Sequence, residues 1–462
     1  MEPRTMKVIS NEEWVETQFG NCELGNSLRT KRLKSVAAAM LKSPERSLPK
    51  QNTSWKDVKA AYRFFNASGV TFKSVAQKHW EQTRKTPAGR HLLISDTTDI
   101  DKLSHPATEG LGMLGGGTGR GVQLHSCLVF NCNTKQLVGS AGALLHYRKR
   151  ACKRETRMQR LGRERESEIW GNLVEQIGPP PTGSQWIHVF DRGGDNFEAL
   201  CHIRLTKCDW IIRAAKLQRN VIATSCAVLP LGSAIKEAEY LGQYDLTLRS
   251  RPGVKARTAR LIVSATKITL PRPRHCSQWV KDTGITEIES NVVIVREEKA
   301  RKGVKPICWV LLTSLPTRTL TQAWQVIDDY EHRWMIEEFH KIIKSGCSIE
   351  KHALRTADRL EPLIGLIAVM GTRLLQLKYI GRNQPNAKAR THVPKDWLKA
   401  LILIRPELKP AELTVYSFFR ELAKLGGFLA RKGDGEPGWE TVWTGFQKLQ
   451  LLLDGMRLIA PI

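Results

Sequence analysis

The chain has 462 residues and is strongly basic, with 72 Lys and Arg against 45 Asp and Glu and a formal net charge of +27. Apolar residues make up 41% of the sequence, which is enough for two or three globular domains with buried cores. So large a surplus of cations predicts a polyanionic partner. Nucleic acid is the first candidate, because phosphate neutralisation drives its binding, and an anionic membrane surface is the competing one.

The sequence argues against a secreted or membrane-spanning protein. Residues 1–19 lack the apolar segment of a secretory signal. The longest apolar run, 362–377, is shorter than a membrane span and contains Arg373, so we expect a buried helix there. The 10 cysteines include no C-x-x-C pair and no zinc-finger spacing. We therefore expect a soluble cytoplasmic protein with reduced thiols and without structural zinc or disulfides.

Residues 1–75 have the pattern of a small basic helical domain. Asn26 is placed to cap a helix over 27–42, and Ser54 to open a second helix through a capping box. The first helix would carry cations around an apolar seam, namely Arg29, Lys31, Arg32 and Lys34 around Leu28, Leu33, Val36 and Leu41. Such a domain is typical of proteins that read a DNA end, and a basic helical cap without function is the alternative.

From about residue 90 the sequence predicts an α/β domain. Short apolar or alternating runs indicate strands, with one helix over 166–177, and the runs are 91–95, 123–131, 136–147, 185–190, 244–250, 258–270, 291–298 and 307–314. From residue 320 onward the pattern is helical. This succession predicts an α/β catalytic domain over 76–375 with a β-rich insertion at about 205–318, followed by a helical domain over 376–462.

Two stretches rich in Arg or Gly carry weaker signals. Residues 148–166 mix many cations with glutamates, which favours a solvated, mobile connection, and direct DNA contact is the alternative. Residues 115–121, GGGTGRG, lack the Gly-Lys-Ser/Thr ending of a phosphate-binding loop, so we expect a turn.

A helix predicted over 439–453 carries a broad apolar stripe. Its members recur at helical spacing and are Trp439, Val442, Trp443, Phe446, Leu449 and Leu453. The stripe fits either a core or a subunit interface. Its two tryptophans, near the end of the sequence, favour an interface.

Residues 330–344, YEHRWMIEEFHKIIK, predict an amphipathic helix with an unusual polar face. At about 100° per residue the apolar side chains fall on one stripe, formed by Met335, Ile336, Phe339, Ile342 and Ile343. Tyr330, Arg333, Glu337 and Lys344 gather in a narrow arc almost opposite, and Glu338 points away from them. A carboxylate, two cations and a phenol in one row favour an anion lying along this face. A solvated face with internal ion pairs is the alternative.

Three carboxylates are candidates for catalysis. One apolar run leads straight into Asp96 and another into Asp191, and acids at the ends of buried strands meet where an α/β sheet opens. Glu337 lies on the polar helix face described above. Three adjacent carboxylates repel unless a cation compensates them, and two Mg²⁺ ions about 4 Å apart would suit phosphodiester cleavage. Taken singly, each aspartate is more often a strand-end cap than a ligand.

Three motifs in this order resemble the DDE transposases of the IS-four insertion-sequence family. They are DTTD at 96–99, DRGGDNF at 191–197 and Y-x2-R-x3-E-x6-K over 330–344. The likeness extends over nearly the whole chain, through ELGNSLRTKRL and AYRFFNASGV, RGVQLHSCLVF and EEFHKIIKSG, and finally LGGF.

The resemblance implies an RNase H-like fold with the three acids at its centre. Asp96, Asp191 and Glu337 would be catalytic and would bind two Mg²⁺ ions, with Mn²⁺ able to substitute. Tyr330, Arg333 and Lys344 would hold DNA phosphates beside the cleavage point.

Four further DNA-binding residues are implied. Trp309 would stack on a base flipped out of the transposon end, although a strand tryptophan is as often part of the core. Arg213 would contact DNA from the insertion, and Arg29 and Arg32 from the N-terminal helices.

The implied activity is cut-and-paste transposition by a homodimer. A water would nick one strand at the element's end, the freed 3′-hydroxyl would form a hairpin, a second water would open it, and the 3′-hydroxyl would attack target DNA. No side chain becomes covalently attached in this scheme, so Tyr330 is not a nucleophile. The implied partners are terminal inverted repeats, target DNA and a second copy in a synaptic complex, without a membrane, at the bacterial nucleoid.

The sequence departs from the family pattern at two points, and two other functions compete. DRGGD keeps Asp191 but lacks a neighbouring acid of the usual DREAD, and Asp99 is a spare acid beside Asp96. A non-catalytic end-binding regulator is the main alternative. Because all three acids and the helix motif are intact, the sequence favours an active enzyme. A plain Mg²⁺-dependent nuclease leaves the basic N-terminal domain and the apolar C-terminal helix unexplained.

Overall fold

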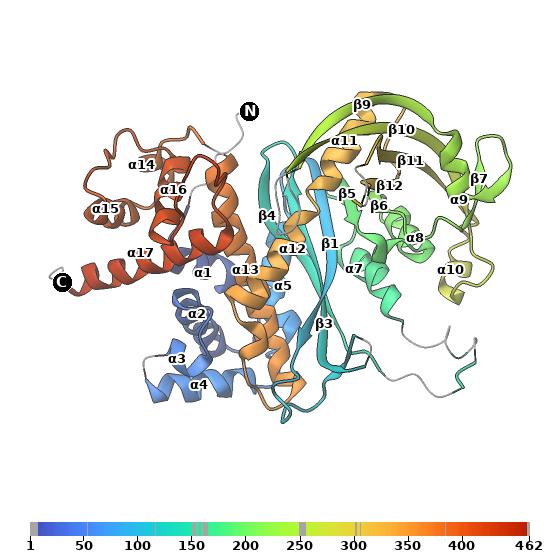
Figure 1. Ribbon diagram of the computed structural model, residues 1–462. Coiled ribbons are helices and arrows are strands. Elements are labelled where there is room, and N and C mark those ends of the chain that lie inside the picture. The colour runs from blue at the N-terminus through green and yellow to red at the C-terminus, as the bar shows by residue number, and fades with distance from the viewer. Residues whose placement is uncertain are drawn as a thin grey trace.

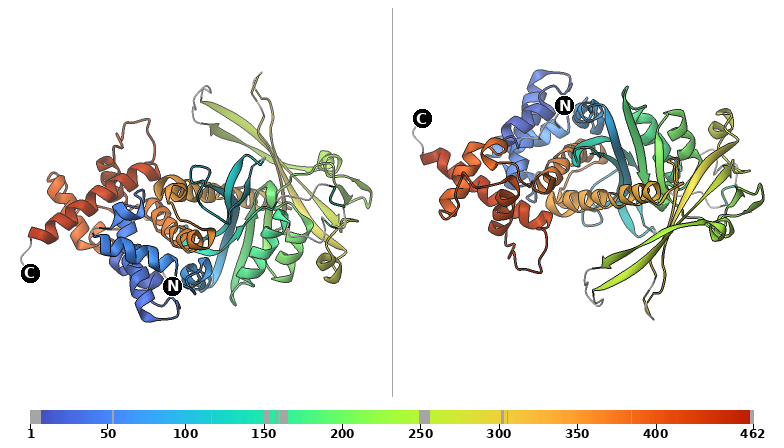
Figure 2. Two further views of the ribbon diagram at one scale, coloured as in Figure 1. Left: turned by 90° about the horizontal axis from the view of Figure 1, so that it is seen from below. Right: turned by 90° about the horizontal axis from the view of Figure 1, so that it is seen from above.

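A computed structural model describes residues 8–459, apart from 53, 116, 150–153, 157–158, 160–164, 249–255, 301–302, 305 and 384. In chain order it consists of a helical bundle, a mixed sheet with helices on both faces, and a second group of helices (Figure 1). The N-terminal and C-terminal helices lie together on one side of the sheet, and a β-rich insertion extends from the other side (Figure 2). The predicted α/β architecture with helical regions at both ends is confirmed.

The N-terminal bundle follows the predicted caps closely. Its helices are α1 (Asn11–Phe19), α2 (Ser27–Lys42), α3 (Leu48–Gln51), α4 (Trp55–Phe65) and α5 (Phe72–Arg84). The Asn26 side chain accepts a hydrogen bond from the Arg29 N–H at 2.9 Å, and Ser54 accepts one from the Asp57 N–H at 3.1 Å.

The prediction of an apolar seam on α2 is wrong for one residue. Leu33, Val36 and Leu41 are buried, but Leu28 is 72% exposed. At about 100° per residue Leu28 lies roughly 140° from Leu33 around the helix, so it falls outside the stripe that faces α1 and α4.

The central sheet has the strand order β4-β3-β1-β5-β6. Its strands are β1 (Gly89–Asp101), β2 (Gly112–Leu114), β3 (Gly119–Asn131), β4 (Gln136–His146), β5 (Ser184–Phe190) and β6 (Asp209–Arg213). β1, β5 and β6 are parallel, whereas β3 is antiparallel to both β1 and β4. Among the described glycine-rich residues, 115, 117 and 118 form the predicted turn between β2 and β3, whereas 119–121 already belong to β3. Most of the arginine-rich stretch 148–166 lies outside the described residues.

Helices cover both faces of this sheet. The 3-10 turn η1 (Glu166–Glu168), α7 (Ile169–Ile177) and α8 (Phe197–Leu205) connect the strands and pack on one face. Helices α5, α12 (Trp334–Lys341) and α13 (Ala357–Asn383) pack on the other. The buried apolar side chains accordingly form two clusters, one with α7 and α8 and one with α5, α12 and α13.

The insertion continues the sheet through one antiparallel strand. Its elements are β7 (Asn220–Ala223), β8 (Val228–Pro230), α9 (Leu231–Ala234), η3 (Ile235–Glu237), β9 (Glu239–Leu248), β10 (Arg257–Pro271), α10 (Gln278–Asp282), β11 (Glu287–Glu297) and β12 (Cys308–Thr313). Pairing of β12 with β6 joins the insertion to the core in a single sheet of 12 strands.

The rest of the described chain is helical. The elements are α11 (Leu320–Glu331), α12, a π turn η4 (Ile342–Gly346), η5 (Ile349–Lys351), α13, α14 (Ala389–His392), α15 (Lys395–Ile404), α16 (Val415–Leu425) and α17 (Trp439–Ile459). By length and composition α13 is long enough to cross a membrane, but 89% of its most apolar window is buried, as a core helix requires. Because α13 runs across residue 375, the domain boundary proposed there falls inside a helix.

The interface predicted for the stripe on α17 is wrong. Val442, Trp443, Phe446, Leu449 and Leu453 are all buried within this chain. They pack against α13, α15 and α16, so these five residues belong to the core, which was the other prediction for this stripe, and Trp439, its sixth member, is half-buried. The apolar residues of α17 that remain exposed are different ones, near its end.

Candidate active site

Two predicted acids and one arginine form a row at the edge of the sheet. β1 and β5 pair in parallel from Gly89 with Ser184 to Ile94 with Val189. Continuing this register by two residues places Asp96 beside Asp191. The β5–β6 pairing ends at Phe190 with Ile212, so the next residues of the two strands, Asp191 and Arg213, lie side by side at the edge of the sheet. The carboxyl ends of parallel strands therefore bring these three side chains to one place.

Asp96 does not end its strand, contrary to the sequence prediction. β1 continues to Asp101, paired with β3, while its other neighbour β5 stops at Phe190. Asp96 thus lies in mid-strand at the point where one partner has ended. Asp191 follows β5 directly, and its Oδ1 accepts a hydrogen bond from the Gly193 N–H at 2.7 Å.

The single helix predicted over 330–344 is also wrong. α11 ends at Glu331 and α12 begins at Trp334. Between them the N–H groups of Arg333 and Met335 bond only three residues back, to Tyr330 and His332. Tyr330, at the end of α11, is only 5% exposed, and its ring lies 6.0 Å from the Arg333 guanidinium, so it stays on the side of the segment that faces the acids.

The apolar side of this segment agrees with the prediction. All five residues of the predicted stripe are buried, namely Met335, Ile336, Phe339, Ile342 and Ile343. Glu338 points away from Glu337, as predicted, and pairs with Lys378 and Tyr379 on α13.

Arg333 joins the first and third acids. Its Nη1 lies 3.4 Å from Oδ2 of Asp96, and its Nη2 lies 2.5 Å from Oε1 of Glu337. Burial and the negative charge of Asp191 raise the pKa of Asp96 to about 6, with a smaller contribution from Glu337, while Arg333 acts in the opposite direction. These interactions place the three carboxylates within one electrostatic group.

The chemistry of this group fits a divalent cation. Carboxylate oxygens are hard ligands, and a cation would relieve the repulsion that raises the pKa of Asp96. Among the described residues, however, no three His, Cys, Asp or Glu side chains converge on one point as metal ligands do. The guanidinium of Arg333 lies between Asp96 and Glu337 and supplies the positive charge there.

An aromatic pair lies beside the acids. The rings of Trp309 and Tyr330 are 5.9 Å apart and inclined by 62°. Burial raises the pKa of Tyr330, and the neighbouring Arg333 guanidinium acts in the opposite direction. The Tyr330 hydroxyl makes no well-formed hydrogen bond within the described chain. Trp309 lies on β12, two residues before Leu311, which pairs with Arg213. A buried hydroxyl left without a partner is costly unless a ligand satisfies it.

The remaining predicted residues lie around or apart from this group. Lys344 is on the π turn with its Nζ 3.7 Å from Glu350, and Arg213 donates to the Cys308 carbonyl oxygen at 3.3 Å. Asp99 accepts a hydrogen bond from Gln123, and it points to the opposite face from Asp96 because side chains alternate along a strand.

The two N-terminal arginines bond within their own bundle. Arg29 donates to the carbonyl oxygens of Leu24 and Ser68, at 3.0 and 2.7 Å. Arg32 forms an ion pair with Asp57 at 3.2 Å. Both lie on α2, apart from the acids.

Two supporting contacts were missed by the sequence analysis. Asp329, which is buried and immediately precedes Tyr330, forms an ion pair with Arg90 on β1. Thr97, next to Asp96, bonds through its hydroxyl to Nδ1 of the buried His125 at 2.8 Å. Partners 239 residues apart share no local pattern, so no signal in the sequence pointed to the first contact.

Comparison with known protein families matches three successive parts of the chain. Residues 11–70 match a model described as transposase DNA-binding, residues 161–370 the transposase DDE domain, and residues 368–461 the transposase Tn5 dimerisation domain. The DDE match contains Asp191 and Glu337 and begins after Asp96, so the place of Asp96 beside them rests on the register of β1 and β5.

Proposed function

The chain belongs to the DDE transposases, and from that membership we propose that it is a cut-and-paste enzyme working through a DNA hairpin. The family match makes the chain an enzyme of DNA cleavage and strand transfer that depends on a divalent metal. The proposal of a hairpin mechanism rests on one observation. At the edge of the sheet Asp96, Asp191 and Glu337 form one group, and the aromatic pair of Tyr330 and Trp309 lies beside it.

Asp96, Asp191 and Glu337 are proposed as the ligands of two Mg²⁺ ions. When bound, such ions activate a water and stabilise the leaving oxygen of a phosphodiester. The raised pKa of Asp96 supports this assignment, because clustered carboxylates that disfavour ionisation are suited to a cation. Arg333, which now pairs with Asp96 and Glu337, is then released to hold a DNA phosphate.

The neighbouring side chains are proposed to shape the DNA. A base flipped out of the duplex end would stack on Trp309, and the orphan hydroxyl of Tyr330 would bond to the adjacent phosphate. Removing a base from the stack lets the 3′-hydroxyl reach the opposite strand for hairpin formation. Lys344 would leave Glu350 and contact a second phosphate.

DNA and a second copy of the chain are the partners. The DNA-binding and dimerisation matches support both. We propose further that the dimer holds two terminal inverted repeats in a synaptic complex, with each active site acting on DNA bound through the other subunit, before attack on target DNA.

The test uses a DNA fragment carrying the inverted repeats that flank this gene. Wild type, Glu337→Ala and Glu331→Ala are incubated with it in Mg²⁺ or Ca²⁺, and products are separated on a denaturing gel. Glu331 is an exposed acid at the end of α11 and serves as the matched control. We expect nicks and hairpins from wild type and Glu331→Ala in Mg²⁺ and from neither in Ca²⁺, and no products from Glu337→Ala. Specific binding without cleavage by all three proteins would instead identify a non-catalytic end-binding regulator.

A further inference from the structure

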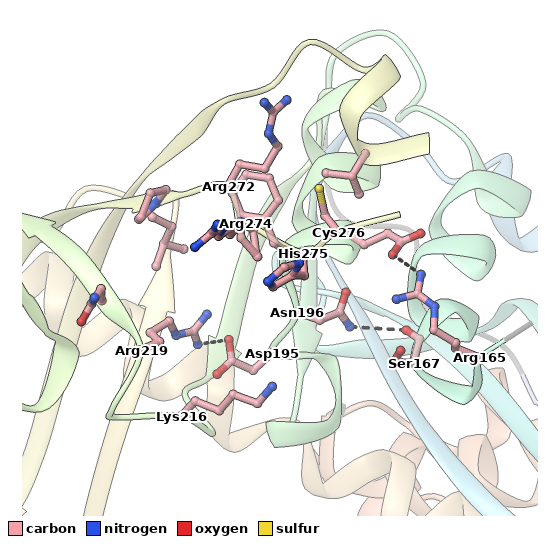
Figure 3. A pocket seen from close by; sticks show the side chains of 17 residues that line it. Arg165, Ser167, Asp195, Asn196, Lys216, Arg219, Arg272, Arg274, His275 and Cys276 are labelled. Atoms are coloured by element: carbon pink, nitrogen blue, oxygen red, sulfur yellow. Dashed lines mark hydrogen bonds and ion pairs between the residues drawn. The ribbon is translucent and has the colours of Figure 1, made fainter. Parts of the chain in front are cut away.

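A charged cavity of about 580 Å³ opens beside Asp195 and Lys216 (Figure 3). Its walls are the turn η1, the start of α8, the connection from β6 to β7, and the connection from β10 to α10. Its apolar lining, such as Phe197 and Val280, belongs to the core cluster of α7 and α8, whereas Tyr330 belongs to the cluster on the opposite face. The edge with the acids therefore lies between the cavity and the Tyr330 side.

The cavity has more positive than negative charge. Its two acids are both paired internally, Asp195 with Arg219 and Glu198 with Arg165. Three cations that line it, Lys216, Arg272 and Arg274, have no acidic partner among the described residues. A cavity that presents unpaired cations suits an anionic ligand better than a neutral small molecule.

Asp195 ties this cavity to the candidate active site. It lies four residues after Asp191, beyond the short turn η2 (Arg192–Gly194). Its side chain is fully buried, and its Oδ2 accepts a hydrogen bond from the Ala215 N–H at 2.6 Å. The loop that carries Asp191 is thus fastened to the segment that carries Lys216, so Lys216 keeps a defined position relative to Asp191.

The unpaired cations come from two separate walls. In Figure 3, Arg274 and His275 lie on one side, and Asp195, Arg219 and Lys216 on the other. The guanidinium of Arg272 reaches away from these groups in the same view. Cations facing each other across an open cavity suit a ligand that carries several negative charges in a line, as a phosphate backbone does.

We propose that this cavity binds the phosphate backbone of duplex DNA beyond the cleavage point, on the opposite side of the acids from Tyr330 and Lys344. The proposal rests on the transposase function proposed above. The DNA segment is either the sequence flanking the element or the target, which present the same backbone. Lys216 and Arg274 are the residues that contact it.

Binding to full-length protein provides the first test. The variant is Lys216→Ala with Arg274→Ala, and the matched control is Lys395→Ala with Lys399→Ala, two exposed cations on α15. Affinity for a fluorescent duplex without the terminal repeat is measured by anisotropy over a range of salt concentrations. We expect the slope of log K against log salt to fall by about two for the cavity variant and to stay unchanged for the control. No fall, or equal falls in both variants, would overturn the proposal.

Two reactions then distinguish the source of the backbone. Cleavage is compared on donor DNA with a long or a short flank, and strand transfer is followed from pre-cleaved ends into a plasmid. A loss confined to the long-flank donor assigns the cavity to flanking DNA, and a loss confined to strand transfer assigns it to the target. If neither reaction changes, the cavity is not on the reaction path and the proposal fails. Failure of the transposase function itself would appear separately, as absence of metal-dependent cleavage by the wild type, while the anisotropy result would still stand.

Discussion

At the scale of single residues, the balance of charge around Asp96 governs the candidate site. Its carboxylate is buried near Asp191 and Glu337, and Arg333 is the one cation that bonds to it among the described side chains. A carboxylate in such surroundings resists ionisation, and added positive charge stabilises its ionised form. The same group therefore links the stability of the folded chain to its affinity for cations.

Asp96→Asn is expected to stabilise the metal-free protein at high pH. The pKa of Asp96 is about 6 in the folded chain against 3.8 for an unperturbed aspartate, so between these values the folded state binds more protons than the unfolded state. Stability contributed by this group is therefore lost as the pH rises through about 6. In EDTA, we expect the variant to gain about 2 kcal/mol in the free energy of unfolding near pH 8 and almost nothing near pH 4.

Urea unfolding at the two pH values measures this gain. Asp99→Asn, on the opposite face of β1, is the matched control and should not gain stability. Adding Mg²⁺ should stabilise wild type and not Asp96→Asn. An equal response of both proteins to Mg²⁺ would contradict the assignment of Asp96 as a ligand.

Tyr330→Phe is expected to separate nicking from hairpin formation. The change removes only a buried hydroxyl that has no partner within the described chain, so the fold should be unaffected. In the proposed scheme that hydroxyl holds a DNA phosphate at the turn of the hairpin. Losing one hydrogen bond to a charged group should therefore decrease hairpin formation about tenfold, while some first-strand nicking remains. Product ratios on a denaturing gel measure the effect. A covalent protein–DNA adduct formed by the wild type would refute the scheme.

At the scale of elements, the junction between α11 and α12 carries the aromatic and cationic part of the site. Its position depends on the ion pair between Asp329 on α11 and Arg90 on β1. Gln325 on α11 also donates to Asp329, at 3.1 Å. The buried pair thus orients the last turn of α11, from which Tyr330 extends next to Trp309.

Asp329→Asn is expected to destabilise the chain and to reduce cleavage. The side chain of Asp329 is 2% exposed, and losing its charge leaves Arg90 half-buried without a carboxylate, at a cost of about 3 kcal/mol. The neighbouring Asp328 forms only an exposed pair with Lys135 at 3.9 Å, so Asp328→Asn should cost less than about 1 kcal/mol. Chemical denaturation of the two variants gives the comparison. Equal losses would show that burial of the Arg90 pair is unimportant.

Two glycines of α17 provide a matched pair for the C-terminal helices. A Cβ at Gly445 would overlap the carbonyl oxygen of Leu422 on α16, whereas a Cβ at Gly455 would meet nothing within 4 Å. We expect Gly445→Ala to cost about 3 kcal/mol, because α16 and α17 must separate. Gly455→Ala should instead add about 0.5 kcal/mol through helix propensity. Thermal unfolding of both variants tests this, and a harmless Gly445→Ala would contradict the close approach of the two helices.

At the scale of the whole molecule, the two ends of the chain meet. Lys42 on α2 pairs with Asp454 on α17 at 3.1 Å, and Arg457 pairs with Glu12 on α1 at the same distance. The buried side of α17 packs within its own chain, while leucines near its end face outward. An exposed apolar surface in the part that matches a dimerisation domain is the natural candidate for contact with a second copy.

Leu451→Asp with Leu458→Asp is expected to give a monomer. The two side chains are 72% and 88% exposed, so the folded monomer should tolerate the change while an apolar interface would not. Leu403→Asp on α15, at a position 69% exposed, is the matched control. Light scattering should show loss of the dimer only in the α17 variant. That variant should still bind a single transposon end but fail to cleave paired ends, and a dimer that persists would place the interface elsewhere.

Local patterns by themselves indicated most of the helices and strands, the family and the candidate residues of this protein. The caps at Asn26 and Ser54, the strand runs and the apolar stripe at Met335 depend on neighbours a few residues apart, and such information is contained in the sequence. Charge and motif spacing pointed to DNA and to the acids. These predictions needed no knowledge of which segments meet.

Only the tertiary structure decided where side chains end up once those segments pack. The covering of the α17 stripe by α15 and α16, the continuation of β1 past Asp96 along β3, and the burial of Tyr330 at a three-residue turn all depend on distant partners. The same holds for the Arg90–Asp329 pair and for the cavity whose walls come from four separate segments. Helical and strand periodicity set which side of an element is apolar, but the free energy of burial is decided by what lies across from it, and that partner can be hundreds of residues away.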